Sequence, residues 1–529
     1  MNIQPIKFNI SRVGFKGNKN TTQPQETVLE RSPKKDEFTI SVGYVNDGHG
    51  QSNNMMRILS GIKGDIKLSA GDNDLGDEKN QGVHKATTMF LNIAGIKASA
   101  LGNHELDTSQ KDLIETIKNY DGDFLCVNYS KEPLENQSEY DIEKLGRAEL
   151  DKYLKKSKIV EVKGEKIGLV GASPMDMFER LTHPNYYADS KIASLEDTIE
   201  EIQDEVDHLK EQGVNKIFLL SHLGHKRDKV VAENTDGIDV IIGGHTHELL
   251  YDIKEGENLL YSESGEPVII TEAGKDGNYF GKLNLTFDKD GVITQAQNNI
   301  GESRLFYKNM INQYVFDEIL GKPENIGYIK QAPPPPKSLV EENPHANFVC
   351  DVMREKTNSD IALWHHSGVR SFFHEGEINS RDVKDMAPFV DYIVTAEVPE
   401  KVLVDAFKKA IEVTYESSLH KPGLIAVSGM NYTVDPEEGK LVEMNFVDKN
   451  GVEHKIDVDN PRADKLYKVV TDEFLMSAGA DFNVFAPEDV YIEKFPYDKD
   501  VMTAEYIKEM NEPVVINQVG RIKFVHEED

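Results

Sequence analysis

The sequence predicts a layered α/β domain followed by a second, α+β domain. From Phe38 onwards, short β-rich runs alternate with longer polar-amphipathic stretches, which is typical of a layered α/β domain. The chain has 529 residues, whereas one domain ordinarily takes roughly 100–200. A QAPPPPK run at 331–337 favours an extended surface connector between two cores.

The β-rich runs of the first domain are expected to be strands at 38–45, 65–70, 97–101, 123–127, 166–172, 216–221, 239–244, 267–271 and 282–287. Residues 194–212 have isoleucine, valine and leucine at helical spacing, and Gly213 follows as a helix end signal. The expected divisions are a disordered tail at 1–37, a first domain at 38–302, a linker helix and connector at 303–337, and a second domain at 338–529.

The composition excludes several classes of function. Lys and Arg number 60 against 92 Asp and Glu, a net charge of −32, which repels polyanions and argues against nucleic-acid binding. No apolar run approaches the roughly 18–20 residues of a membrane span. The N-terminus lacks the apolar core of a secretory signal, so we expect a cytoplasmic protein. Cys126 and Cys350 lie far apart, which argues against a thiolate metal site.

Five short polar clusters each follow an expected strand. They are VNDGHG with Asp47 and His49, SAGDN with Asp72, ALGNHELD with Asn103, His104 and Asp107, LLSHLGH with His222, and IIGGHTH with His245 and His247. The strand ends of an open α/β sheet gather at one rim, so these segments are expected to meet there.

The side chains of these clusters predict a metal site. Carboxylates, an amide oxygen and imidazoles form a mixed oxygen and nitrogen set that suits Zn, Mn, Fe or Co. They offer more coordination bonds than one tetrahedral ion uses, so two ions with a bridging carboxylate are expected. A lone DxH, GD or GNH is better explained by ordinary turn chemistry, whereas GGHTH is a stronger signal, and the five together carry the prediction.

The five clusters, in this order and spacing, resemble the signature of the 5′-nucleotidase family of calcineurin-like metallophosphoesterases. The resemblance implies a four-layer α/β/β/α sandwich in the first domain. It also implies that one divalent ion is held by Asp47, His49, Asp72 and His247, and the second by Asp72, Asn103, His222 and His245. Asp72 would be the bridge between them.

The implied reaction is phosphoester hydrolysis by a metal-bridged hydroxide. His104 is expected to point at the substrate and to stabilise charge on the transferring phosphoryl group or the leaving oxygen. Asp107 is three residues further on, on the same face of a helical turn, and is expected to orient His104 and raise its pKa.

The resemblance continues through the second domain, which binds the nucleotide in the family. It implies substrate-binding roles for Arg370, Phe474 and Asp481. Family members hold the base between two aromatic rings, but Leu424 stands at the second ring position here. Loss of one stacking face costs about 1–3 kcal/mol.

The expected substrate is a small anionic phosphoester, with nucleoside 5′-monophosphates or related nucleotides first. The departures from the family pattern leave other substrates open: a cyclic nucleotide or nucleotide sugar, a sugar phosphate, or a sulfur ester. A non-catalytic binding protein with the same fold is a third interpretation. Against it, every expected ligand position is filled.

Overall fold

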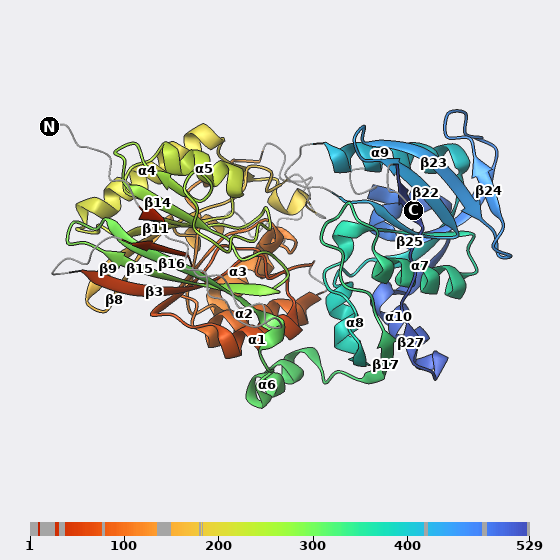
Figure 1. Ribbon diagram of the computed structural model, residues 1–529, viewed down its shortest axis with the longest axis horizontal. Coiled ribbons are helices and arrows are strands. Elements are labelled where there is room, and N and C mark those ends of the chain that lie inside the picture. Colours follow the sequence, from red (N-terminus) through yellow and green to blue (C-terminus); the bar gives the residue numbers. More distant parts are fainter. Residues whose placement is uncertain are drawn as a thin grey trace. The chain divides into compact units, whose positions relative to one another are not determined.

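The computed structural model describes residues 9–10, 27–30, 37–76, 80–134, 150–178, 181, 184–416, 422–478 and 484–525. The chain divides into two compact units, Met1–Gly321 and Lys322–Asp529 (Figure 1). Among these described residues, no helix is both long and apolar enough to cross a membrane.

Two β-sheets form the centre of the first unit. The eight-stranded sheet has the order β1 (Asn9–Ile10), β2 (Thr27–Glu30), β16 (Ile293–Glu302), β15 (Tyr279–Phe287), β3 (Phe38–Val45), β4 (Ile66–Ser69), β5 (Ala98–Ala100) and β6 (Asp123–Leu125). The six-stranded sheet has the order β13 (Leu259–Tyr261), β14 (Pro267–Thr271), β12 (Val240–Ile242), β11 (Ile217–Ser221), β9 (Glu165–Ala172) and β8 (Ser157–Val162). A two-stranded ribbon joins β7 (Tyr129–Lys131) to β10 (Ser190–Ile192).

The sheets and helices of this unit stack in four layers. Inward-facing side chains of both sheets share one apolar core. The outer face of the eight-stranded sheet packs against α1 (Ser52–Gly61), α2 (Gln81–Ala94) and α3 (Gln110–Asn119). The outer face of the six-stranded sheet packs against α4 (Leu195–Glu211) and α5 (His225–Glu233). The expected α/β/β/α sandwich is therefore confirmed.

Helix α4 illustrates how local sequence sets these elements. The Ser194 hydroxyl accepts a hydrogen bond from the backbone N–H of Asp197 and caps the helix. Ile202, Val206 and Leu209 share one face and are buried. Gly213 follows the helix with φ +78°, a conformation in which a glycine has no steric penalty.

Most expected strands form within two or three residues of their expected limits, and 38–45 and 267–271 form as expected. The antiparallel strands β8 and β16, which the sequence analysis did not assign, complete the sheets. Within the stretch expected as a tail, residues 27–29 pair with β16. The remainder of 1–36, apart from 9–10 and 27–30, lies outside the described residues.

The second unit has the expected α+β character. Its five-stranded sheet has the order β21 (Ile425–Ser428), β18 (Ile361–His365), β25 (Leu466–Asp472), β20 (Tyr392–Pro399) and β26 (Tyr491–Asp498). One face packs against α7 (Pro344–Thr357), α8 (Ser380–Met386) and α10 (Lys499–Met510). The other face packs against α9 (Glu400–Tyr415) and a four-stranded sheet of β24 (Glu453–Ile456), β23 (Lys440–Val447), β22 (Met430–Asp435) and β28 (Ile522–Phe524).

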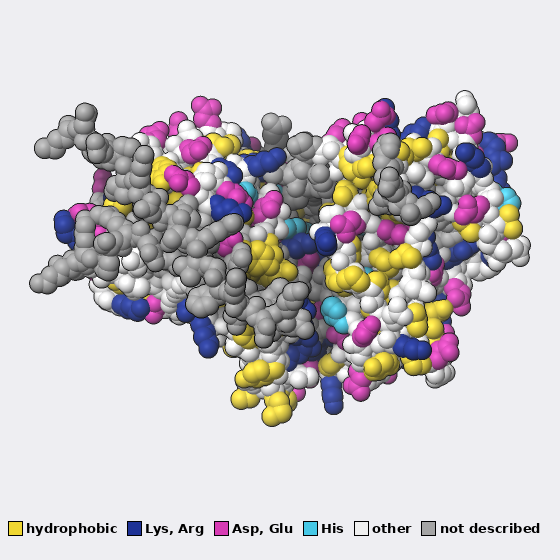
Figure 2. Space-filling model, in the orientation of Figure 1, with side chains coloured by type: hydrophobic (Ala, Val, Ile, Leu, Met, Phe, Trp, Pro, Cys, Tyr) yellow, Lys and Arg dark blue, Asp and Glu magenta, His cyan; other side chains and the backbone are white. Residues whose placement is uncertain are grey.

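The stretch expected as a connector, 303–337, contributes to both units. Helix α6 (Met310–Leu320) packs on α1 and α2 of the first unit through Phe316. Strand β17 (Asn325–Gln331) pairs with β19 (Gly376–Asn379) and β27 (Val514–Val515) in the second unit. Met310 and Ile311 are 84% and 73% exposed, so α6 presents apolar side chains to solvent (Figure 2).

Candidate metal centre

The polar clusters all follow the carboxyl ends of parallel strands. Asp47, Asp72 and Asn103 follow β3, β4 and β5, which run parallel. His222 follows β11, and His245 and His247 follow β12, which is parallel to β11. Because both sheets present these ends to one rim, segments separated by up to two hundred residues meet as expected.

Asp72 lies among four imidazoles, those of His49, His104, His222 and His245. Its Oδ2 atom is 3.0 Å from Nε2 of His222 and 3.7 Å from Nε2 of His49. Its Oδ1 atom accepts a hydrogen bond of 2.8 Å from the backbone N–H of His104. One set of potential ligand atoms comes from Asp72, His222 and His245, and another from His49, Asp72 and His104. Asp72 therefore stands where a bridging carboxylate would stand.

A third set of potential ligand atoms surrounds Asp47. Oδ1 of Asp47 lies 3.4 Å from Nε2 of His247 and 4.0 Å from Nε2 of His49. In each of the three sets, the ligand atoms lie within 4.8 Å of one another. The structure thus brings together six of the seven expected metal ligands through side-chain nitrogen and oxygen atoms.

The backbone at the cluster adopts a conformation that side chains disfavour. Nine non-glycine residues in the described ranges have positive φ, and five of them are expected metal ligands: Asp47, His49, Asp72, His245 and His247. Each such conformation costs of the order of 1–3 kcal/mol and persists only where surrounding contacts enforce it. Such strain concentrates at functional sites, and here it falls on the clustered polar residues.

Buried hydrogen bonds hold this backbone in place. The carboxylate of Glu105 accepts bonds from the backbone N–H groups of Asp72, Asn73 and Gly102 at 2.8–3.0 Å. Nδ1 of His222 donates to the carbonyl of Ala70 at 2.7 Å. Because Nδ1 makes this hydrogen bond, Nε2 is the ring nitrogen that faces Asp72.

The charges of the cluster are strongly coupled. Burial alone would raise the pKa of Asp72, but His222 and His104 beside it hold that pKa well below its ordinary value. Burial alone would lower the pKa of His222, but Asp72 and Asp47 raise it to about 10. Burial and the charge of Asp72 raise the pKa of Glu105 to about 7. The carboxylates that face the imidazoles are therefore ionised at neutral pH.

The cluster fits a divalent cation. The side-chain oxygen of Asn103 is buried and has no hydrogen-bond partner among the described residues, although a buried polar atom ordinarily has one. Nε2 of His222 approaches Asp72 at 3.0 Å without hydrogen-bond geometry. A donor set of carboxylate, amide and imidazole suits Zn, Mn, Fe or Co.

His104 and Asp107 form a pair beside the cluster. Nδ1 of His104 lies 2.7 Å from Oδ2 of Asp107, and their side chains are 20% and 11% exposed. The His104 ring lies 5.2 Å from the His49 ring, edge to face. The Asp107 carboxylate also accepts the backbone N–H of Gly76 at 3.2 Å. Because Nδ1 faces the carboxylate, Nε2 is the atom that His104 can offer to a substrate.

The expected substrate-binding residues belong to the second unit. Arg370 is 8% exposed, and its guanidinium carbon lies 5.4 Å from the centre of the Phe389 ring. Phe474 begins a π-helical turn and lies 5.8 Å from the His365 ring. Leu424 is fully buried in an apolar core, so it offers no surface to a base. Asp481 lies outside the described residues.

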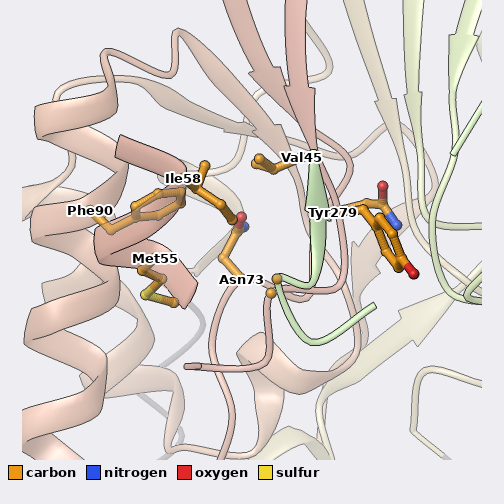
Figure 3. Close-up of a pocket in the computed structure, with 9 residues that line it drawn as sticks. Val45, Met55, Ile58, Asn73, Phe90 and Tyr279 are labelled. Atoms are coloured by element: carbon orange, nitrogen blue, oxygen red, sulfur yellow. The ribbon is translucent and has the colours of Figure 1, made fainter. Parts of the chain in front are cut away.

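A small cavity lies at the end of β3, beside the segment that carries Asp47 and His49 (Figure 3). Val45, Met55, Ile58 and Phe90 give it apolar walls, and the space open to the centre of a water molecule is about 10 Å³. That volume holds one water molecule at most. The cavity is therefore no substrate site, although its lining includes neighbours of Asp47 and His49.

Three carboxylates at the cluster were missed by the sequence analysis. Glu105 stands inside a quoted motif, but no role was assigned to it. Asp176 follows β9 and places Oδ1 3.3 Å from Nε2 of His245. Asp276 follows β14 and places Oδ1 2.9 Å from Nδ1 of His49. The signal that could have found the last two is the one used for the clusters, a polar residue just after a strand end.

Comparisons with known proteins agree with this geometry. Residues 40–249 match the model of the calcineurin-like phosphoesterases, and residues 325–487 match the model of the 5′-nucleotidase C-terminal domain. The first match contains every expected metal ligand, and the second contains Arg370, Phe474 and Asp481.

Similar proteins span most of the chain. A 5′-nucleotidase of Diplobatis ommata is 26% identical, over 82% of this chain and 77% of that protein. The trifunctional nucleotide phosphoesterase YfkN of Bacillus subtilis is 25% identical over 93% of this chain, which spans only 35% of that protein. The crystal structure of a 5′-nucleotidase precursor from Thermus thermophilus has a TM-score of 0.72 and 22% identity, and covers 93% of this chain and 100% of its own.

The two family matches follow one another along the chain in the order that the resemblance implied. The sandwich of the first unit and the α+β second unit agree with them. The chain belongs to the 5′-nucleotidase family of calcineurin-like metallophosphoesterases, which are metal-dependent hydrolases of phosphate esters.

Proposed function

We propose that this protein hydrolyses nucleoside 5′-monophosphates or related nucleotides with two divalent cations in the cluster around Asp72. The observation that carries the proposal is the convergence of Asp47, Asp72 and four imidazoles at one sheet rim, where five of these six residues have positive φ. The names of the relatives, a 5′-nucleotidase and a nucleotide phosphoesterase, support a nucleotide as the substrate.

The distances suggest which residues would hold each ion. Asp47, His49 and His247 form one group with Asp72 beside it, and Asp72, His222 and His245 form the other. Asn103, with its unpartnered buried oxygen, would complete the second group. Two such ions lower the pKa of a water molecule and neutralise charge on phosphoryl oxygens.

His104 would act on the substrate directly. Asp107 fixes the ring through Nδ1 at 2.7 Å, so Nε2 is directed away from that carboxylate. A protonated ring would stabilise the charge that develops on the phosphoryl group or the leaving oxygen.

A second candidate substrate is favoured by one observation in the second unit. Leu424 is fully buried, so of the two expected stacking positions only Phe474 carries a ring. One stacking face is worth about 1–3 kcal/mol per base, so discrimination for a nucleoside should be weak. Phosphoesters with other leaving groups, such as sugar phosphates, nucleotide sugars or cyclic nucleotides, are therefore the second candidate.

The test is a substrate panel on purified protein reconstituted with Mn, Zn, Co or Mg. The panel holds nucleoside monophosphates, a cyclic nucleotide, a nucleotide sugar, a sugar phosphate and an aryl phosphate. We expect nucleoside 5′-monophosphates to give the largest kcat/KM, and Asp72→Asn to remove activity and bound metal together. Absence of bound metal and of hydrolysis in the wild type would overturn the proposal. A sugar phosphate as the preferred substrate would select the second candidate.

A further inference from the structure

Asp276 lies against the metal centre from a loop that no expected motif contains. The loop joins β14 to β15, and Asp276 places Oδ1 2.9 Å from Nδ1 of His49. The Asp276 side chain is 4% exposed and the His49 side chain is fully buried. A buried hydrogen bond that involves a carboxylate is about twice as strong as a neutral one.

The backbone of Asp276 is tied to the same ligand segment. Its N–H donates to the carbonyl of Asp47 at 2.6 Å, and its own carbonyl accepts Nδ2 of Asn54 at 2.9 Å. Asp276 has φ +56°, a conformation that costs of the order of 1–3 kcal/mol and persists only where surrounding contacts enforce it. Side chain and backbone thus approach Asp47 and His49 together.

This arrangement decides which nitrogen of His49 faces the cluster. An ionised carboxylate can only accept, so Nδ1 of His49 carries the hydrogen and Nε2 keeps its lone pair. Nε2 lies 3.7 Å from Oδ2 of Asp72 and 4.0 Å from Oδ1 of Asp47. Those separations exceed a hydrogen bond, but they suit atoms that share an ion at about 2.0–2.2 Å from each.

We infer that Asp276 is a positioning residue of the metal centre, which holds His49 in the tautomer and orientation that present Nε2 to a divalent cation. The inference rests on the proposed function, because it assigns His49 as a ligand. Removal of such a partner ordinarily weakens metal affinity about 10–100-fold. The loss of affinity should concern the ion that His49 binds, because Asp276 contacts Asp47 and His49. The ligand group of the other ion is held by different hydrogen bonds, from His222 to Ala70 and from backbone N–H groups to Glu105.

The test compares the metal-free wild type with Asp276→Asn and Asp290→Asn. Asparagine tolerates positive φ and keeps the side-chain volume, so Asp276→Asn removes mainly the charge. Asp290 is a matched control, because its side chain is 66% exposed in the turn between β15 and β16. Each protein is titrated with Mn²⁺ against a chelator, with electron paramagnetic resonance as the readout of paired and single ions. We expect one of the two affinities to fall about 10–100-fold in Asp276→Asn only.

A second readout separates positioning from folding. In zinc-loaded wild type, the Nδ1–H proton of His49 should resonate far downfield, and Asp276→Asn should move it upfield. Urea unfolding of the metal-free proteins checks that the fold is retained. If Asp276→Asn does not fold, Asp276→Glu replaces it. This variant keeps the charge on a longer side chain and is expected to lower the binding affinity for the same ion.

The outcomes distinguish the two claims. If the wild type binds no divalent cation, the proposed function fails. If the wild type binds two cations, and folded Asp276→Asn binds both with wild-type affinity and an unshifted proton resonance, the positioning role is wrong and the proposed function stands.

Discussion

The pair formed by His104 and Asp107 allows a quantitative test of the proposed mechanism. We consider His104→Ala, Asp107→Ala and the double variant. Asp107 contacts the ring of His104 and the backbone of Gly76, so it should affect turnover mainly through His104. The backbone N–H of His104 still donates to Asp72 in an alanine variant. Bound metal should therefore be unchanged in all three.

The size of each effect follows from the geometry. The contact is 2.7 Å long between side chains that are 20% and 11% exposed, and a hydrogen bond to a charged group in such a place contributes about 1.5–3 kcal/mol. At about 1.4 kcal/mol per factor of ten, Asp107→Ala should lower kcat roughly 10–150-fold. Loss of the imidazole that stabilises charge on the phosphoryl group or the leaving oxygen, in His104→Ala, should lower kcat about 10²–10⁴-fold.

The assay measures kcat with a saturating nucleoside monophosphate, and metal content by mass spectrometry. We expect the double variant to be as slow as His104→Ala within about threefold, because groups that act as a unit are not additive. A double variant slower by the product of both single effects would refute the assignment of Asp107 as a partner of His104. Loss of both metals in His104→Ala would refute the role of His104 itself.

Two further predictions concern the site's packing and its protons. A Cβ on Gly102 would lie 2.2 Å from Oδ1 of Asp72, so Gly102→Ala should lower the free energy of unfolding by about 1–3 kcal/mol and weaken metal binding. A Cβ on Gly82 has its nearest contact at 3.5 Å, so the control Gly82→Ala should change neither quantity. Urea unfolding and metal titration measure the two effects. In the metal-free protein, Asp72 and Asp47 overcome the effect of burial and raise the pKa of His222 to about 10. Binding of that proton stabilises the folded state. This stabilisation is complete below about pH 6.5 and disappears as pH rises through about 10. An ion must displace it, so metal affinity should rise up to about tenfold per pH unit in chelator competition, and a flat profile would contradict this.

The sequence predicted most of the fold because alternating apolar runs report local structure directly. Strand β3 and strand β14 formed as expected, and Ser194 and Gly213 marked the ends of α4. The family was also predicted, because each of the five motifs is a short contiguous stretch, and the two-domain architecture was predicted from the chain length and the proline run. The antiparallel strands β8 and β16 were missed, since their burial depends on partners elsewhere in the chain.

The second unit shows why substrate recognition was harder to predict. Arg370 and Phe474 could be named from motifs, but their surroundings could not. The full burial of Leu424 and the approach of the His365 ring to Phe474 arise from packing between distant strands. Residue types in a motif therefore indicated a binding domain without fixing what the domain prefers.

The sequence by itself determined which side chains could hold cations, because the ligand types stand beside apolar strands and glycines in contiguous motifs. Only the tertiary structure decided how those side chains are held. Three features join segments far apart in the chain: the hydrogen bond between His49 and Asp276, the approach of Asp176 to His245, and the position of Asp72 among four imidazoles. Distances of this kind are set by how two sheets pack face to face, and no local pattern of residues encodes them.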